Sequence, residues 1–208
     1  MAPDQLDFHR IKRNPLLIII SGPSGVGKDS VVKGLLARNP KLHFVITTTS
    51  RAPREGEVEG VDYFFVSKEK FEQMILQDEF MEYALVYEQY KGGTKQQVRD
   101  AFASGKDVIL RLDVQGATTY RQIFPEAILV FVLPTSEEEL LFRLRDRGTE
   151  TEETIRLRMA TTAKELDTMP IFDYFVYNAA GKLDEAVDHL ANIISAEHDR
   201  IHQRKVEI

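Results

Sequence analysis

A glycine-rich loop that ends in a lysine is the stretch of this sequence best suited to chemistry. An apolar run, Leu16 to Ile20, is followed by Gly22 and, after four intervening residues, by Gly27 and Lys28. A strand, a glycine-rich turn and a helix N-terminus place backbone N–H groups around an anion, and the helix dipole favours negative charge there. A lysine at this position reaches the β- and γ-phosphates of a nucleotide. The loop therefore predicts a nucleotide-binding site.

The residue after this lysine departs from the usual pattern. It is Asp29, where Ser or Thr normally holds a magnesium ion, and Ser30 follows it. The dipole tolerates an acid in the first turn of a helix. A carboxylate oxygen can also bind Mg²⁺ as a hydroxyl does. We expect Asp29, Ser30 or water to complete the magnesium shell.

A second group of residues suits another phosphate. Arg51 and Arg54 flank Pro53, which stiffens the segment, and Tyr63 follows in the same stretch. Arginine binds phosphate through two parallel N–H donors. An arginine pair at this spacing is by itself usually a solvated surface pair, so its interpretation depends on the neighbouring motifs.

Two acids form the third candidate group: Glu82 in "EFMEY" and Asp113 in "RLDVQG". Guanine presents two donors, N1–H and N2–H₂, on one edge, and a carboxylate can accept both, whereas adenine offers no such pair. Glu82 alone would be an exposed strand residue. Asp113 ends a predicted buried strand, which is where ligands bind in open α/β sheets.

The fourth group is Arg147 and Arg158, which bracket the start of the charged stretch "GTETEETIRLRMATTAKEL". Thr149 and Glu152 have the spacing of a capping box, so this stretch is expected to be helical. Phosphoryl transfer needs cations over the transferring group, and a closing lid supplies them. The alternative is a solvated surface helix.

Short apolar runs alternate with longer amphipathic stretches, a rhythm typical of a parallel α/β sheet. The predicted strands are Leu16–Ile20, Asp107–Leu112, Ala127–Leu133 and Asp173–Asn178. The predicted helices are Gly27–Arg38, Val114–Ile123, Glu137–Arg145 and Leu183 to about Arg200. The stretch from Thr47 to Thr94 interrupts this rhythm and predicts an inserted subdomain.

Composition excludes several classes of protein. The net charge of −6 argues against sequence-blind binding to nucleic acid, and the absence of cysteine excludes disulfides and thiolate metal sites. No apolar stretch approaches the ~20 residues that span a bilayer, so no membrane partner is expected. The first residues lack the apolar core of a secretory signal, and Asp4 and Asp7 count against an intact transit peptide. We expect a soluble intracellular protein.

Together and in this order, these segments resemble the guanylate kinase family. The resemblance runs from about Leu16 to at least Ala191 and depends on "SGPSGVGK", "TTSRAPREGEVEGVDYFFVS", "LDVQGA" and "RGTETEETI". It implies an α/β P-loop nucleoside monophosphate kinase fold, a single domain with a parallel five-stranded sheet flanked by helices. The core would comprise 14–46, 95–146 and 167–208, the GMP-binding subdomain 47–94 and the helical lid 147–166. The implied activity is Mg²⁺-dependent transfer of the γ-phosphoryl group of ATP to GMP or dGMP, in purine nucleotide metabolism.

The resemblance also assigns roles residue by residue. It places ATP on Gly22, Pro23, Ser24, Gly25, Val26, Gly27, Lys28, Asp29 and Ser30, with Asn178 on the adenine side. It places the GMP phosphate at or near Thr47, Arg51, Arg54 and Tyr63 and the guanine on Glu82 and Asp113, and Tyr90, Thr94 and Gln115 complete the GMP set. The implied catalytic residues are Lys28, Arg51, Arg54, Arg147 and Arg158, which act by position and charge without a dedicated general base.

Three departures from the family pattern concern the site. Asp29 is the first, and Arg111 in place of the first acid of Asp-x-Asp is the second. In "YKGGT", Lys91 replaces a tyrosine and Gly93 replaces a hydroxyl residue, which puts one hydroxyl contact to GMP in doubt. The first and third departures resemble the plant organellar branch, which implies a plastid or mitochondrial matrix, with the cytoplasm as the alternative. Some bacterial and plastid members are inhibited by guanosine tetraphosphate, which is therefore a candidate regulator. The oligomeric state is expected to be a monomer or homodimer.

Two other functions compete with this interpretation. Guanylate kinase-like domains of scaffold proteins bind phosphorylated peptides and typically have a degraded phosphate loop, whereas the loop glycines and Lys28 are intact here. The second alternative is a related kinase acting on another phosphorylated small molecule. Glu82 and Asp113 argue against it, because their use is to recognise guanine.

Overall fold

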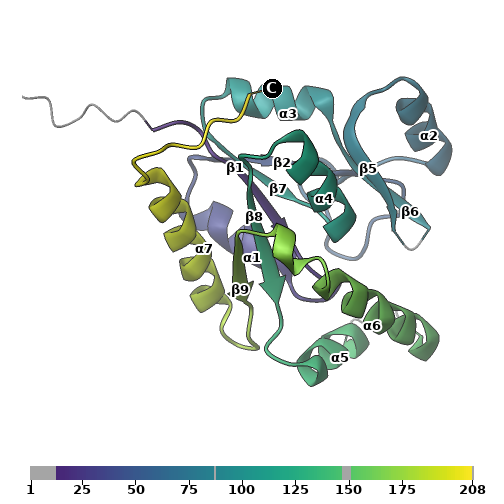
Figure 1. Ribbon diagram of the computed structural model, residues 1–208. Coiled ribbons are helices and arrows are strands. Elements are labelled where there is room, and N and C mark those ends of the chain that lie inside the picture. Colours follow the sequence, from purple (N-terminus) through teal and green to yellow (C-terminus); the bar gives the residue numbers. More distant parts are fainter. Residues whose placement is uncertain (1–12, 87, 147–150, 208) are drawn as a thin grey trace, which may run out of the picture.

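The computed structural model describes residues 13–86, 88–146 and 151–207. Within these residues, a sheet of five parallel strands runs through the centre of the molecule (Figure 1). In spatial order its strands are β2 (Leu42–Val45), β7 (Asp107–Arg111), β1 (Leu17–Ser21), β8 (Ile128–Leu133) and β9 (Tyr174–Tyr177). The predicted α/β fold with a parallel five-stranded sheet is confirmed.

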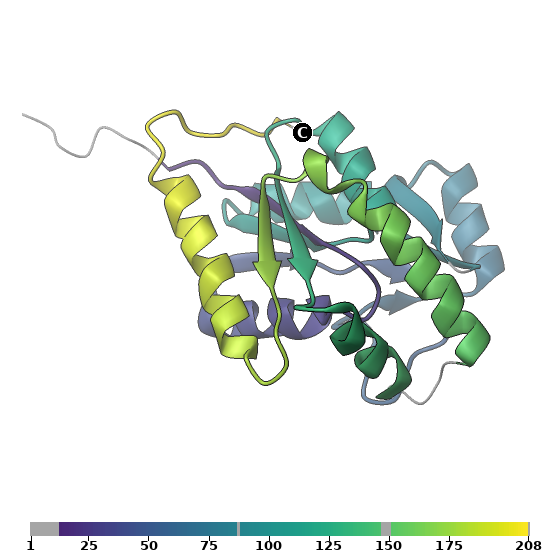
Figure 2. The same cartoon turned by 60° about the horizontal axis from the view of Figure 1, so that its bottom comes forward.

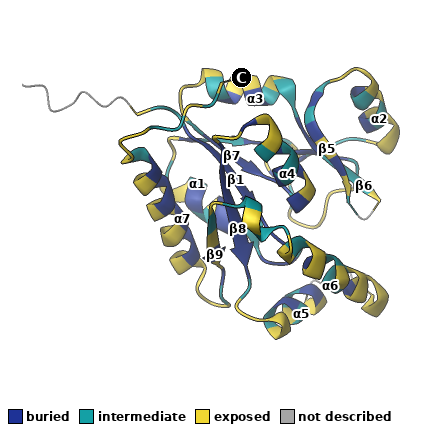
Figure 3. Ribbon diagram, viewed as in Figure 1, coloured by how far each residue is buried: buried dark blue, intermediate teal, exposed yellow. Residues whose placement is uncertain are grey.

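The middle of this sheet is apolar on both faces. Every residue of β1 and β8 is buried, and Ile19 lies in register between Leu110 and Leu129 (Figure 3). Continuous Ile, Val and Leu suit a strand that is covered on both sides, as parallel strands are. The result is a rigid frame that fixes the loops at its carboxyl edge.

Helices cover the two faces of the sheet. Ile18 and Ile20 pack with α1 (Lys28–Arg38) and α7 (Leu183–His198) on one face. Leu17 and Ile19 pack with α3 (Lys95–Ala103) and α4 (Val114–Ile123) on the other. The alternation along β1 follows from the two-residue period of a strand.

A second sheet lies to one side of the first. Its strand order is β4 (Phe64–Phe65), β3 (Thr48–Thr49), β6 (Gln89–Thr94) and β5 (Phe80–Val86). The helix α2 (Lys68–Leu76) packs on it, and the Phe71 ring stacks on Phe80 at 4.2 Å and on Tyr90 at 5.1 Å between centroids. This separate apolar cluster gives the inserted segment a small core of its own.

Two helices, α5 (Glu137–Asp146) and α6 (Glu152–Leu166), lie together at the carboxyl edge of the central sheet, and a short 3₁₀ turn, Met169–Ile171, returns the chain to β9 (Figure 2). The expected capping box at Thr149 and Glu152 is wrong. Thr151 caps α6, since its hydroxyl accepts a hydrogen bond from the backbone N–H of Thr154. In return, the Thr154 hydroxyl accepts from the backbone N–H of Thr151 and donates to the Thr151 carbonyl oxygen. Thr149 lies outside the described residues.

Two elements of the central layer are absent from the sequence-based prediction. The strand β2 is a short edge strand in which only Leu42 and Val45 are buried, so its pattern is weak. The helix α3 is mostly polar, with Val98 and Ala101 as its buried residues. Thr94, which caps α3 at Gln97, was its one clear sequence signal.

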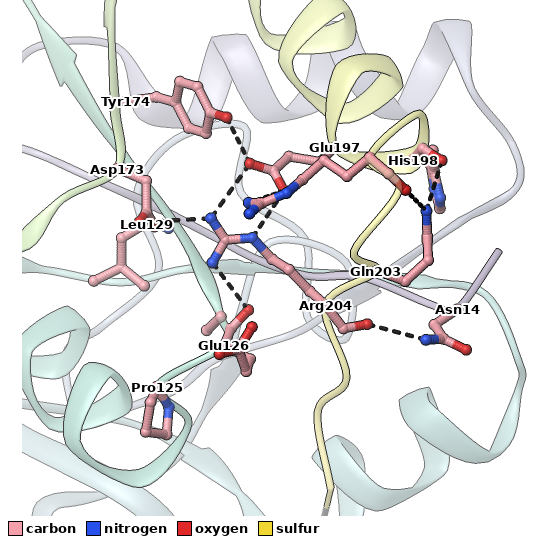
Figure 4. A network of polar contacts seen from close by, with 12 residues as sticks. Asn14, Pro125, Glu126, Leu129, Asp173, Tyr174, Glu197, His198, Gln203 and Arg204 are labelled. Atoms are coloured by element: carbon pink, nitrogen blue, oxygen red, sulfur yellow. Dashed lines mark hydrogen bonds and ion pairs between the residues drawn. The ribbon is translucent and has the colours of Figure 1, made fainter.

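The segment after α7 is fixed to the sheet by a polar network (Figure 4). The guanidinium of Arg204 donates to the carboxylate of Glu197, which is 1% exposed, at 2.8 Å, and the amide of Asn14 donates to the Arg204 carbonyl at 3.1 Å. Burial acts to raise the pKa of Glu197, but hydrogen bonds from Arg204 and Tyr174 hold it below its ordinary value. The network therefore joins the end of the chain to β9 and to the residues before β1.

Candidate active site

The glycine-rich loop follows β1 and requires glycine at two points. Gly22 has φ +136°, and a Cβ there would lie 2.3 Å from the carbonyl oxygen of Val132. Gly27 has φ +86°, and its Cβ would lie 2.4 Å from Nδ2 of Asn178. These conformations and close approaches are open only to a residue without a side chain. The loop is thereby held against β8 and opens α1.

Lys28 folds back across the loop. Its ammonium group donates to the carbonyl oxygens of Gly22 at 2.6 Å and Pro23 at 2.9 Å. Burial lowers the pKa of Lys28 to about 8, and the neighbouring Asp29 partly opposes this shift. A bound anion would restore the full positive charge, so this position suits a phosphate.

Two side chains support the loop from outside. The carbonyl oxygen of Val26 accepts hydrogen bonds from Nη1 of Arg143 at 2.9 Å and from Nδ2 of Asn178 at 2.8 Å. A third contact comes from α6, where Nη1 of Arg158 donates to the hydroxyl of Ser24 at 2.6 Å. Arg143 was missed by sequence reasoning, because a charged residue on an amphipathic helix gives no sign of what it contacts.

Two of the departures from the family pattern contact each other. The guanidinium of Arg111 lies 3.1 Å from Oδ1 of Asp29. Its side chain is only 5% exposed; it donates to the carbonyl of Asp62 at 2.8 Å and lies 4.4 Å from the centre of the Tyr63 ring. Arg111 thus stands at the end of β7 between the phosphate loop and the second sheet.

The arginine pair divides between two positions. Arg51 is buried and forms a two-pronged ion pair with Glu57, with both N–O distances at 2.6 Å, and its guanidinium lies 4.8 Å from the Tyr63 ring centre. Arg54 lines the cleft between the two sheets. Lys91 also lines it, and burial lowers the pKa of Lys91 although the nearby Asp113 partly offsets that effect.

Acidic side chains from β5, from α6 and from the end of β7 line the cleft. Glu82 on β5 is 6% exposed, and burial, helped by the charge of Asp113, raises the pKa of Glu82 to about 8. Asp113 caps α4 by accepting from the N–H of Gly116 at 2.9 Å. A third acid, Glu165 on α6, faces the same cleft, and burial raises its pKa to about 7. Its spacing from Arg158, two helical turns, was the signal that could have placed it there.

The cleft brings most of the predicted residues together. Its lining includes Gly22, Ser24, Gly25, Gly27, Lys28, Asp29, Ser30, Thr47, Arg54, Tyr63, Glu82, Asp113 and Arg158. Seven other predicted residues are not part of the lining, namely Pro23, Val26, Arg51, Tyr90, Thr94, Gln115 and Asn178. Arg147 lies outside the described residues.

Four of those seven residues contact other parts of the structure. Tyr90 stacks on Phe71 in the core of the second sheet, and Thr94 caps α3. Arg51 lies against Tyr63, and Asn178 holds the phosphate loop. Arg51 and Asn178 therefore support the site, whereas Tyr90 and Thr94 serve the core of the second sheet and the start of α3.

A phosphate loop at the carboxyl edge of a parallel sheet, facing a cleft with cations and buried acids, defines the class of P-loop phosphotransferases. A family model described as guanylate kinase matches residues 14–197. The chain belongs to the guanylate kinase family, a family of nucleoside monophosphate kinases. This confirms the family resemblance and the kinase class predicted from the motifs.

Individual relatives agree with the family model. Guanylate kinase 2, chloroplastic/mitochondrial, from Oryza sativa subsp. japonica is 50% identical over 195 residues, which are 93% of this chain and 68% of the relative. Guanylate kinase from Clostridium tetani is 46% identical over 193 residues, covering 93% and 91% of the two chains. The crystal structure of guanylate kinase from Anaplasma phagocytophilum has a TM-score of 0.75 at 28% identity, over 91% of this chain and 89% of that chain.

Proposed function

We propose that this protein transfers the γ-phosphoryl group of ATP to the phosphate of GMP, giving ADP and GDP, and that dGMP is a weaker substrate. The observation that supports this most is the shared cleft. Lys28 and the phosphate loop line it from the end of β1 in the central sheet, and Glu82 on β5 lines it from the second sheet, with Arg54 in the same lining. The first side suits a triphosphate and the second suits a guanine base joined to a phosphate.

The roles of the residues follow from charge and position. Lys28 and Arg158 would neutralise the transferring phosphoryl group, and Arg54 would hold the acceptor phosphate. Phosphoryl transfer needs alignment and charge stabilisation more than covalent chemistry, so the terminal phosphate oxygen of GMP attacks without a dedicated base. Arg51, which is turned toward Glu57, would position Tyr63 or exchange partners when the acceptor phosphate arrives.

Three parts of the chain would divide this work. Residues 47–94 would bind GMP, 147–166 would form a lid over the phosphates, and the remainder would form the ATP-binding core. The support is that 47–94 contains the second sheet with its own core, while α6 carries Arg158 and Glu165 to the cleft. Thr47 and Tyr63 would line the GMP side.

Magnesium would be bound together with ATP. Mg²⁺ in phosphate sites is typically held by one or two protein oxygens plus phosphates and water. Asp29 and Ser30 meet that need, since both line the cleft next to Lys28. Among the described residues there is no group of three or more acids and histidines able to hold a metal without the substrate. The ion would screen the phosphate charges during transfer.

We also propose guanosine tetraphosphate as an inhibitor, because it presents the same guanine edge and a 5′ phosphate group to the GMP side. The rice relative's name supports a plastid or mitochondrial location, with the cytoplasm as the alternative. No helix among the described residues is both long and apolar enough to cross a membrane. Sedimentation would distinguish monomer from homodimer, and organelle fractionation would test the location.

The test is ADP release by the purified chain with ATP, Mg²⁺ and each of GMP, dGMP, AMP, CMP and UMP. We expect turnover with GMP, less with dGMP, and little with the others. Absence of GMP-dependent turnover by the folded protein would overturn the proposal. Binding of a phosphorylated peptide in that case would favour the scaffold type of function instead.

Guanine binding should depend on the protonation of Glu82. Below the Glu82 pKa of about 8, the carboxyl group holds a proton and cannot accept both guanine donors. Binding then requires loss of that proton, so GMP affinity should rise with pH by up to about tenfold per unit below pH 8. Glu82→Gln should weaken GMP by about 10- to 100-fold and remove most of this slope, leaving ATP binding within about twofold.

Calorimetric titration with GMP between about pH 6.5 and 8.5 measures this slope. The matched control is Glu72→Gln on α2, which removes an acid outside the cleft and should leave both affinity and slope unchanged. A Glu82→Gln protein with the wild-type slope would show that another group, such as Glu165, controls the pH dependence.

A further inference from the structure

A buried tyrosine hydroxyl lies behind the acid side of the cleft. Tyr120 on α4 is 0% exposed, and its Oη has no hydrogen-bond partner among the described residues. Burying a hydroxyl without a partner costs stability, and phenylalanine would fill the same space without that cost. The hydroxyl therefore calls for a use beyond packing.

The Tyr120 hydroxyl lies next to Gly93, which contacts the carboxylate of Glu82. A Cβ on Gly93 would lie 3.4 Å from the Tyr120 hydroxyl, and the N–H of Gly93 donates to Oε1 of Glu82 at 3.4 Å. Gly116, one helical turn before Tyr120, faces the other oxygen, because its Cβ would lie 3.0 Å from Oε2 of Glu82. Two glycines thus border the same carboxylate, and the tyrosine hydroxyl lies next to one of them. The packing of α4 against β5 brings these groups together (Figure 1).

The carboxylate of Glu82 is weakly held. Its hydrogen bond from Gly93, at 3.4 Å, is the only one it accepts among the described residues, and this length is well beyond the usual 2.7–3.2 Å. A catalytic or binding side chain with so few contacts can rotate. A guanine-binding acid needs both oxygens directed at the base, which requires further donors behind it.

We propose that Tyr120 is a positioning residue for Glu82: its hydroxyl donates to the carboxylate, directly or through one water, when guanine binds. This inference depends on the proposed GMP-binding function. Gly93 carries no side chain, and the space beside it is the space that the phenol hydroxyl borders.

The test is Tyr120→Phe, assayed by steady-state kinetics and by thermal unfolding. We expect KM for GMP to rise about five- to tenfold, the effect of losing one hydrogen bond of ordinary strength, while kcat and KM for ATP stay within about twofold. Restoring a hydroxyl by Gly93→Ser in the Tyr120→Phe protein should recover most of the loss, because the new side chain occupies the vacated space. Tyr177→Phe, which removes an exposed tyrosine hydroxyl on β9, is the matched control and should change nothing.

A purely structural role for Tyr120 gives the opposite pattern. Removing an unpartnered buried hydroxyl would then leave KM for GMP unchanged and keep or raise the melting temperature. In a Glu82→Gln background, Tyr120→Phe should have little additional effect on KM for GMP, because the two groups act as one unit. A full and independent effect there would also overturn the proposal. Absence of GMP turnover in the wild-type protein would instead contradict the function itself.

Discussion

Replacing Lys28 with methionine should lower kcat by about 10²- to 10³-fold while the protein stays folded. Methionine keeps the length of the side chain but removes the charge that faces the phosphates. The ammonium donates to the carbonyls of Gly22 and Pro23, so it is held within the loop. Little reorganisation is then needed when ATP binds, and this preorganisation makes the charge effective in the transition state.

The loss should fall mainly on kcat, because the charge that develops on the transferring group is stabilised by Lys28 more than the ground state is. Steady-state kinetics with ATP and GMP measure the loss in kcat, and a melting curve shows whether the protein stays folded. Lys41→Met is the matched control, since Lys41 is exposed on the turn after α1 and does not line the cleft. A Lys28→Met protein with a rate within about fivefold of wild type would mean that the loop does not take part in transfer.

Four of the five central strands and the loop at the end of β1 could be predicted because their signals are local. A continuous apolar strand, a glycine with positive φ and a helix start lie within a few residues of one another between Leu17 and Lys28. The elements that escaped prediction have contacts supplied by distant segments. β2 and α3 are short or polar in sequence, and they gain their burial from β7 and the sheet face.

The same distinction applies to the cleft. The motif residues Lys28, Arg54, Glu82 and Asp113 meet there, as their family positions imply. The contact between Asp29 and Arg111 could not be predicted, although both were recognised as departures, because the two residues lie far apart in the sequence. Residues that act through another residue can be found only from geometry, as Tyr120 shows.

Asp29→Ser and Arg111→Asp should each impair the enzyme's activity or its Mg²⁺ requirement when made alone, and should impair them much less when combined. The single change Asp29→Ser removes one carboxylate partner of the buried Arg111 guanidinium, beside the cleft where Mg²⁺ and the phosphates are proposed to bind. An unbalanced cation there repels the metal, so we expect the Mg²⁺ concentration for half-maximal rate to rise about tenfold. Arg111→Asp places an acid beside Asp29 and Asp62 and removes the contact with the Tyr63 ring. We expect kcat/KM to fall by more than about 10²-fold and unfolding free energy to drop by about 3 kcal/mol.

The double variant restores the Ser and Asp that are usual at these two positions in the family. Its Mg²⁺ requirement should return to within about threefold of wild type, with a coupling free energy of about 2 kcal/mol between the two sites in kcat/KM. The four proteins of this cycle are compared by Mg²⁺ titration at saturating ATP and GMP and by chemical unfolding. If the two losses simply add, the exchanges are independent and Arg111 does not balance Asp29. If the double variant recovers, Asp29 and Arg111 form one exchanged pair, in which an acid beside the phosphates is tolerated because a buried guanidinium from the end of β7 neutralises it.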